Sequence, residues 1–110
     1  MEKAMISQPM GGLTGEEIAN DRNRAIAFLE GQGYEVLNTL FTDDYYNVER
    51  KNKPLMFLAK SLDHMCDADV VYFVDGWQKA RGCRIERMVA ESYGIPIIDE
   101  GEKCVKQYFN

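Results

Sequence analysis

Residues 70–86 read Val-Val-Tyr-Phe-Val-Asp-Gly-Trp-Gln-Lys-Ala-Arg-Gly-Cys-Arg-Ile-Glu, and they carry three structural signals in succession. The apolar run that ends at Val74 is typical of a central parallel strand covered on both faces. Gly76 follows in a loop, and the residues from Arg81 onward predict a helix whose first turns carry Glu86. Ligands of open α/β sheets bind at the carboxyl ends of the strands. Glu86 is therefore a candidate catalytic group.

The rest of the chain alternates between strand and helix signals in the same way. Thr14 and Glu17 form a capping box, which predicts the start of a helix, and Gly31 and Gly33 end it. Pro54 suits the first position of a further helix, in which leucines follow at helical spacing. The predicted strands cover residues 4–7, 34–38, 69–74 and 95–98, and the predicted helices cover 14–31, 54–65 and 81–93. The tail over 102–110 is expected to add a last helical turn or to pack against a neighbour.

Alternating strands and helices imply a parallel sheet with right-handed crossovers. We expect one domain over residues 1–110 with a three-layer α/β, flavodoxin-like (Rossmann-like) fold. Its parallel sheet has four to five strands in the order 2-1-3-4. In this topology the loops after the first and third strands meet, which brings residues 7–12 beside residues 75–77 and the start of the Glu86 helix.

The polar, irregular segment 39–53 is long for a connection inside a small domain, and such segments often form binding loops or lids. Tyr45 and Tyr46 lie within it. These two rings either stack on a ligand or pack the loop itself.

Charge and composition restrict the classes of partner. A chain of 110 residues with a net charge of −5 and a pI near 4.8 does not carry the basic stripe of a nucleic-acid-binding protein. The N-terminus lacks the apolar region of a signal peptide, and no run approaches the length of a membrane span. The three Cys residues are too few and too scattered for a disulfide framework or a zinc site. We expect a cytoplasmic protein without metal, cofactor or membrane partner, whose thiols serve as small apolar residues.

The residues around Glu86 suit a small polar ligand. Gly11 and Gly12 allow the backbone to approach a phosphate, although a turn alone requires such glycines about as often. Gly82 leaves room for a ligand to reach the amides at a helix N-terminus, where an anion is favoured. Trp77 offers a flat face for a base or sugar. A carboxylate at this place can attack the anomeric carbon of a nucleoside.

Other interpretations of these charged residues stay open. A helical Glu is most often a solvated group paired with a neighbour, here Arg87 or Lys79. Arg81 and Arg84 either bind a phosphate as bidentate donors or balance the acidic surface. The only His, His64, is expected to be exposed or to cap its helix rather than to act as a base.

Four segments together resemble the nucleoside 2-deoxyribosyltransferase-like family, and more narrowly its short members from phages and mobile elements. The resemblance covers the chain up to Ile98, and its most specific part is the Gly-Trp…Gly…Glu block. The segments are Ile6-Ser7-Gln8-Pro9-Met10, Gly33-Tyr34-Glu35-Val36-Leu37-Asn38, Cys66-Asp67-Ala68-Asp69, and Gly76-Trp77 through Arg81-Gly82-Cys83-Arg84-Ile85-Glu86.

The resemblance implies cleavage of the N-glycosidic bond of a deoxynucleoside or its 5′-monophosphate, with Glu86 as the nucleophile. It also implies a homodimer or higher homo-oligomer, because neighbouring subunits commonly complete the site in that family. Two carboxylates of the family pattern are missing, at the positions of Ser61 and Ala80. Asp75 or Asp63 is a candidate replacement for the acid that protonates the departing base, although Asp63 points to a different helix face from Ser61.

The sequence therefore predicts an N-glycosidase or deoxyribosyltransferase acting on a nucleoside or nucleotide. The alternative is a non-catalytic module that senses or sequesters a nucleotide in the same cleft, and a structural oligomer with a vestigial pocket is a third hypothesis. The predicted catalytic residues are Glu86 and Asp75. The predicted substrate-binding residues are Ser7, Gln8, Pro9, Met10, Gly11, Gly12, Ser61, Trp77, Arg81, Gly82 and Arg84.

Overall fold

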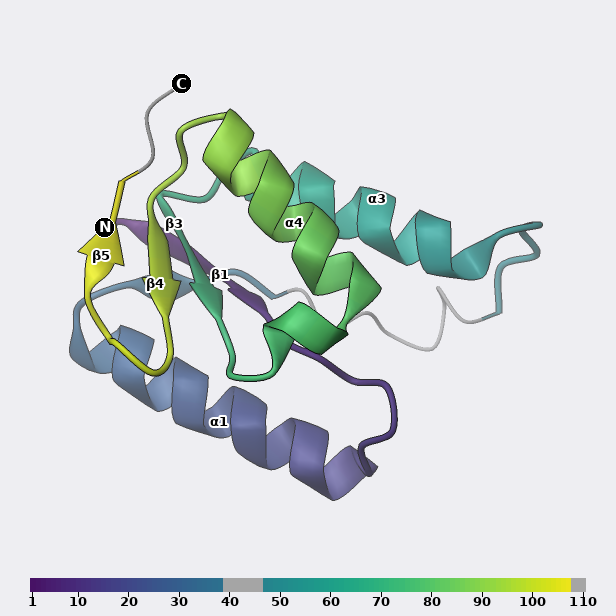
Figure 1. Cartoon of the computed structure of the whole chain (residues 1–110), viewed down its shortest axis with the longest axis horizontal. Helices are drawn as coiled ribbons and strands as arrows, with labels where there is room; N and C mark the ends of the chain where they lie inside the picture. Colours follow the sequence, from purple (N-terminus) through teal and green to yellow (C-terminus); the bar gives the residue numbers. More distant parts are fainter. Residues whose placement is uncertain (39–46, 108–110) are drawn as a thin grey trace.

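The computed structural model describes residues 1–38 and 47–107, and a five-stranded sheet runs through its centre (Figure 1). The strand order is β2-β1-β3-β4-β5, and the first four strands are parallel. The predicted order 2-1-3-4 is therefore confirmed. The strands are β1 (Lys3–Ser7), β2 (Glu35–Val36), β3 (Val70–Phe73), β4 (Ile97–Asp99) and β5 (Val105–Lys106).

Helices cover both faces of the sheet, as Figure 1 shows. Helix α1 (Gly15–Gly31) lies on one face, and α3 (Lys53–Met65) and α4 (Arg81–Ser92) lie on the other. A short 3-10 helix, η1 (Trp77–Lys79), connects β3 to α4. The protein thus has the three-layer, flavodoxin-like α/β fold that the sequence predicts.

Successive residues of the strands alternate between two cores, because side chains along a strand point to opposite faces. Tyr72 packs in the core under α1, beside Ala25 and Leu29 of that helix. Phe73 packs in the other core, beside Met65 of α3 and Ala90 of α4. Burial on both faces explains why β3 is an unbroken apolar run.

The helix boundaries follow the local signals closely. The Thr14 hydroxyl accepts a hydrogen bond from the Glu17 amide, and the Glu17 carboxylate accepts one from the Thr14 amide, which is the predicted capping box. The Asn52 side chain caps α3 by accepting from the Leu55 amide, so that Pro54 is the second helical residue and not the first. The boundaries of α3 and α4 fall within one residue of the prediction.

The described part of the tail, up to residue 107, contains the antiparallel edge strand β5, so the first alternative for the tail, a helical turn, is not present there. Two further local expectations are wrong. The helical spacing of Ile85, Met88 and Val89 predicts that they form the buried stripe of α4. Val89 does pack against the core, but Met88 is 59% exposed, and the buried residues of the helix are Cys83, Glu86 and Ala90. Of the three thiols, only Cys83 is buried as an apolar residue would be, since Cys66 and Cys104 are exposed.

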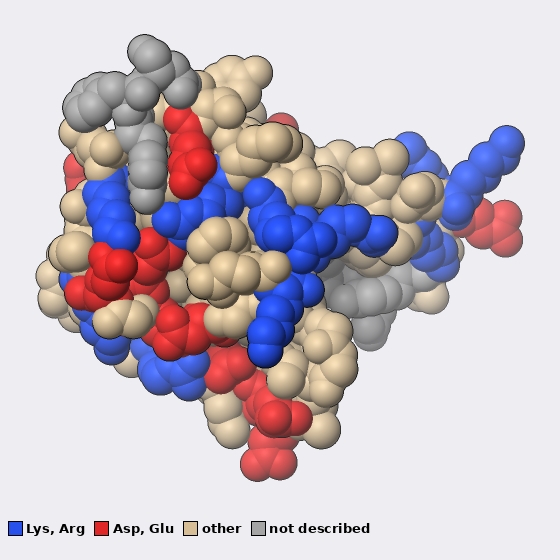
Figure 2. Space-filling view, viewed as in Figure 1, with Lys and Arg blue, Asp and Glu red and all other residues tan. Residues whose placement is uncertain are grey.

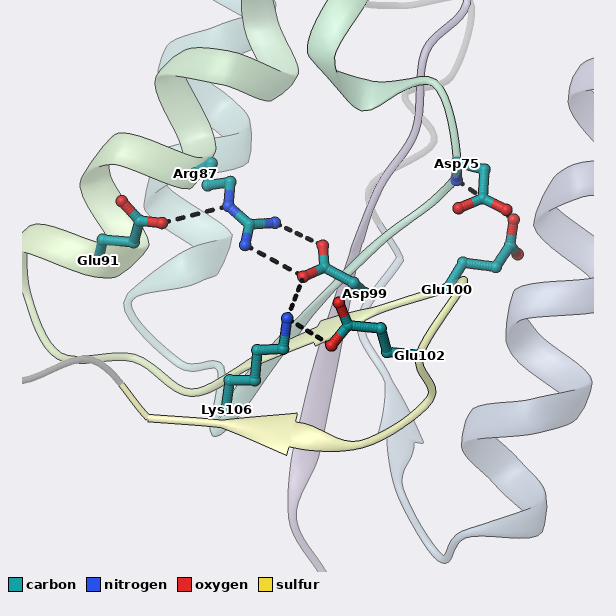
Figure 3. Close-up of polar contacts among 7 residues, drawn as sticks. All are labelled: Asp75, Arg87, Glu91, Asp99, Glu100, Glu102 and Lys106. Atoms are coloured by element: carbon teal, nitrogen blue, oxygen red, sulfur yellow. Dashed lines mark hydrogen bonds and ion pairs between the residues drawn. The ribbon is translucent and has the colours of Figure 1, made fainter.

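An ionic cluster joins α4 to the hairpin of β4 and β5 (Figure 3). Arg87 of α4 binds both carboxylate oxygens of Asp99 in β4. Lys106 of β5 binds the same Asp99 and also Glu102 in the connecting turn. Because the antiparallel strand β5 pairs with β4, the short strand β4, which Pro96 directly precedes, is not the edge of the sheet.

Over the described residues, no helix is both long and apolar enough to cross a membrane. Tyr45 and Tyr46, the candidate stacking rings, lie outside these residues.

Candidate functional site

A cleft of about 880 Å3 lies at the carboxyl edge of the sheet, between the loop after β1, the start of α3 and the start of α4. This volume lies within the range of small-molecule sites, about 300 to 1,000 Å3. The described residues that line it are Ile6, Ser7, Gln8, Met10, Gly11, Arg22, Asn52, Pro54, Leu55, Phe57, Leu58, Ser61, Lys79, Ala80, Arg81, Gly82, Cys83, Ile85 and Glu86. The cleft thus occupies the junction of the loops after β1 and β3.

Glu86 is a buried carboxylate in the wall of this cleft. Its side chain comes from the second turn of α4 and is only 8% exposed. The Ser7 hydroxyl, at the end of β1, donates a long hydrogen bond of 3.4 Å to Oε1 of Glu86. Burial raises the pKa of Glu86 to about 7, and the contact with Ser7 only partly offsets this. Glu86 therefore exchanges its proton near neutral pH, which is where nucleophilic and acid–base groups are effective.

The N-terminus of α4 forms another part of the wall. Ala80 is the N-cap residue and supplies no side-chain hydrogen bond to the first helical amides. The first turn, with Arg81, Gly82 and Cys83, lines the cleft. Amides at a helix N-terminus favour an anion, and the helix dipole adds to this.

Basic side chains gather over η1 and the start of α4 in the space-filling view (Figure 2). Lys79, Arg81 and Arg84 of this segment are all exposed. The face that leads to the cleft is therefore positively charged locally, although the whole chain carries a net charge of −5.

Most of the predicted site residues line the cleft. This holds for Glu86 and for seven of the expected substrate-binding residues, which are Ser7, Gln8, Met10, Gly11, Ser61, Arg81 and Gly82. Pro9, Gly12, Asp75, Trp77 and Arg84 are not among the lining residues.

The residues outside the cleft are held by other contacts. Trp77 meets Phe73 edge to face, at 5.7 Å between ring centroids, and Arg87 lies over its ring. Arg84 donates to the carbonyl oxygen of Gln78 at 3.0 Å. The predicted roles of Trp77 and Arg84 toward a ligand stay predictions.

Asp75, the predicted acid, is exposed, and its amide donates to the buried Glu100. Its position gives no support to proton transfer inside the cleft. Ser61 and Ala80 both line the cleft and bring no carboxylate to it. Glu86 is the only Asp or Glu among the described lining residues.

Sequence reasoning missed Arg22. This residue of α1 is buried and lines the cleft, and its Nη1 donates to Oε1 of Gln8 at 3.5 Å. A signal was present, since Arg22 falls at helical spacing among Ile18, Ala25 and Leu29, which is the face of α1 turned to the sheet. A charged residue on such a face needs a reason to be buried.

The described residues contain no group of three or more His, Cys, Asp or Glu side chains placed to hold a metal ion. The fold and the cleft define the class: a flavodoxin-like α/β domain with a buried glutamate at the carboxyl edge of its sheet. Within that class the chain belongs to the family described as Domain of unknown function (DUF4406), which matches residues 3–99. Neither the curated proteins nor the solved structures contain a match to this chain.

Proposed function

We propose that the protein is an N-glycosidase or deoxyribosyltransferase that acts on a deoxynucleoside or its 5′-monophosphate through Glu86. The observation that carries the proposal is the burial of Glu86 in a cleft of suitable size, beside the start of α4. The resemblance of the Gly76-to-Glu86 block to the nucleoside 2-deoxyribosyltransferase-like family supports the same chemistry.

The reaction has two displacement steps at one carbon. The ionised Glu86 attacks the anomeric carbon, an ester bond forms, and the bond from that carbon to the base nitrogen breaks. The electron pair stays on the base nitrogen, which takes a proton from water. Water or a second base then attacks the same carbon, which releases Glu86 and completes hydrolysis or transfer.

The neighbouring groups match the parts of such a substrate. The loop from Ser7 to Gly11 and the first turn of α4 border the same cleft as Glu86. Ser7 keeps the carboxylate in place, and the uncapped amides with Arg81 suit a sugar hydroxyl or phosphate. Gly82 adds no side chain that would block these amides.

The test is release of free base from a panel of deoxynucleosides and their 5′-monophosphates, followed by chromatography. We expect Glu86→Gln to reduce the rate to that of the uncatalysed reaction, because the amide cannot form the ester. Glu91→Gln is the matched control, since Glu91 lies on the same helix but pairs with Arg87. An added second base distinguishes transfer from hydrolysis. Intact substrates with the wild-type protein, or an unchanged rate in Glu86→Gln, would disprove the proposal.

A second candidate function is a non-catalytic module that binds a nucleotide in this cleft. This function is favoured because Ser61 and Ala80 line the cleft and neither side chain is a carboxylate. Calorimetry decides between the two: nucleotide binding by the wild-type protein without any base release selects the binding module.

We also propose that the protein acts as a homodimer or larger homo-oligomer. Met10 and Leu55 border the cleft and are exposed apolar residues. Association through this side buries apolar surface and encloses the cleft. Light scattering after size-exclusion chromatography measures the mass directly, and a mass equal to one chain contradicts the proposal.

A further inference from the structure

Arg22 is a buried cation without a charged partner among the described residues. Its side chain belongs to α1, is only 6% exposed and lines the cleft. No ion pair of Arg22 occurs among the described residues, whereas Arg24, two residues further on, binds Asp21 and Glu100. Its one hydrogen bond there goes to the neutral Gln8, at 3.5 Å.

An unpaired buried charge is costly, and proteins normally pair such groups. Burial lowers the pKa of Arg22, yet a guanidinium stays charged at neutral pH. Among the described side chains, every nitrogen that is buried from solvent has a hydrogen-bond partner. The guanidinium nitrogens that do not bind Gln8 are therefore accessible to solvent, and Arg22 lines the cleft.

Gln8 holds the guanidinium in this position. Its Nε2 donates to the carbonyl oxygen of Ile18 on α1 at 3.1 Å, and its Oε1 accepts from Arg22. Both polar ends of Gln8 are thus engaged within the protein, which leaves the remaining donors of Arg22 for a ligand.

Arg22 and Glu86 approach the cleft from opposite faces of the sheet. Consecutive residues at the end of a strand point to opposite faces, and Ser7 contacts Glu86 of α4 while Gln8 contacts Arg22 of α1. Figure 1 shows α1 and α4 on the two sides of the sheet. The Arg22 group is therefore separate from the amides at the start of α4.

We propose that Arg22, positioned by Gln8, is an anion-binding subsite that holds a phosphate or carboxylate group of the ligand. The inference deepens the proposed function, because it makes the substrate an anionic nucleotide rather than a neutral nucleoside. The inference rests on the proposed function only for the part of the ligand that Arg22 does not bind, which is the deoxynucleoside. The binding of the anion itself does not require catalysis.

The experiment measures binding by calorimetry in Glu86→Gln protein, so that turnover plays no part. The probes are a deoxynucleoside 5′-monophosphate, the analogue with a 5′-carboxylate, the neutral deoxynucleoside and inorganic phosphate. We expect Arg22→Met to lower the affinity for the two charged nucleoside probes at least about tenfold, which is the effect expected from loss of a charge-assisted hydrogen bond. The affinity of the neutral deoxynucleoside stays unchanged. The stronger of the two charged probes identifies phosphate or carboxylate.

Arg24→Met is the matched control, since it removes a guanidinium from the same helix outside the cleft. It is expected to lower the melting temperature and leave the affinities unchanged. Arg22→Met is expected to raise the melting temperature of the free protein, because it removes an unpaired buried charge, and to abolish stabilisation by phosphate. Arg22→Lys, which keeps the charge but not the planar fork, is expected to bind with intermediate affinity.

Equal affinities of wild-type and Arg22→Met protein for the charged probes would overturn the inference. So would equal binding of the charged and neutral deoxynucleosides by a protein with Arg22 intact. Anion binding through Arg22 without any base release by the wild-type protein overturns the proposed enzyme and leaves this subsite standing.

Discussion

The guanidinium of Arg87 lies over the indole ring of Trp77, with its central carbon 4.3 Å from the ring centroid. The same guanidinium binds the carboxylate of Asp99, as Figure 3 shows. One residue of α4 thus holds both the segment that follows β3 and the end of β4. Trp77, which the sequence offers as a stacking platform, is positioned by the protein's own side chains.

Loss of the Arg87 contacts is expected to destabilise the fold. Arg87→Met leaves the largely buried Asp99 with Lys106 as its remaining cation among the described ion pairs, and it uncovers the Trp77 ring. We expect a loss of about 2 kcal/mol in the free energy of unfolding, measured by urea denaturation with fluorescence of the chain's single Trp. Glu91→Gln removes only the exposed partner of Arg87 and is expected to cost less than about 0.5 kcal/mol. Equal losses in the two variants would contradict the assignment.

Glu100 forms a second structural centre, under α1. It accepts hydrogen bonds from the Tyr72 hydroxyl at 2.9 Å, from two nitrogens of Arg24 and from the Asp75 amide. Burial alone raises the pKa of Glu100, but these donors outweigh it and hold the pKa below its usual range. The carboxylate therefore stabilises the fold above its unfolded pKa, and this contribution is lost as the pH falls through the folded pKa.

A double-mutant cycle tests this centre. Tyr72→Phe is expected to cost about 1 kcal/mol, and Glu100→Ala about 3 kcal/mol, because the latter leaves the buried hydroxyl of Tyr72 without its partner. The double variant is expected to cost less than the sum, since the two side chains share one hydrogen bond. Additive losses in urea denaturation would show that the hydrogen bond contributes nothing.

The raised pKa of Glu86 predicts an unusual pH dependence of stability. The folded pKa of about 7 exceeds the ordinary value of 4.5, so the folded state binds the proton more tightly. The contribution of Glu86 to the free energy of unfolding is fully present below its unfolded pKa and is lost as the pH rises through about 7. Glu86→Gln keeps the neutral form, and we expect it to match wild type near pH 4.5 and exceed it by about 3 kcal/mol near pH 8. If the free energies of unfolding of wild type and Glu86→Gln change in parallel with pH, the raised pKa of Glu86 is refuted.

The same group predicts the pH dependence of the proposed activity. Only the ionised carboxylate attacks the anomeric carbon, so kcat/KM is expected to rise about tenfold per pH unit below the pKa of Glu86 and to level off above it. Initial rates of base release from pH 5 to 9 measure this profile. A rate that is flat between pH 5 and 7 would remove Glu86 from the nucleophilic role.

Two glycines near the cleft are expected to respond differently to alanine. Gly76 has a φ of +92°, so Gly76→Ala costs about 1 to 2 kcal/mol of folding stability. Gly82 lies in the first turn of α4 with no φ strain, and an added Cβ contacts nothing within 4 Å. Gly82→Ala is therefore expected to leave the melting temperature unchanged or higher while weakening ligand binding at the amides. Unchanged binding in Gly82→Ala would show that no ligand approaches there.

Much of the fold follows from patterns within short windows of sequence. The capping box at Thr14, the apolar run of β3 and the alternation of strand and helix each depend on neighbouring residues. The alternation, combined with the right-handed crossover rule, leads to the parallel order 2-1-3-4. Strand β5 escapes prediction because its two residues have no periodicity of their own, and their pairing with β4 depends on a turn.

The amino-acid sequence by itself determines the α/β class, the strand order and the position of Glu86 at the carboxyl edge of the sheet. Only the tertiary structure decides that Arg22 reaches the cleft from α1, while Trp77 and Asp75 do not line it. Periodicity tells which face of an element is buried, but not which side chains from different elements meet. That depends on how the helices pack across the two faces of the sheet, and those contacts join residues far apart in the chain.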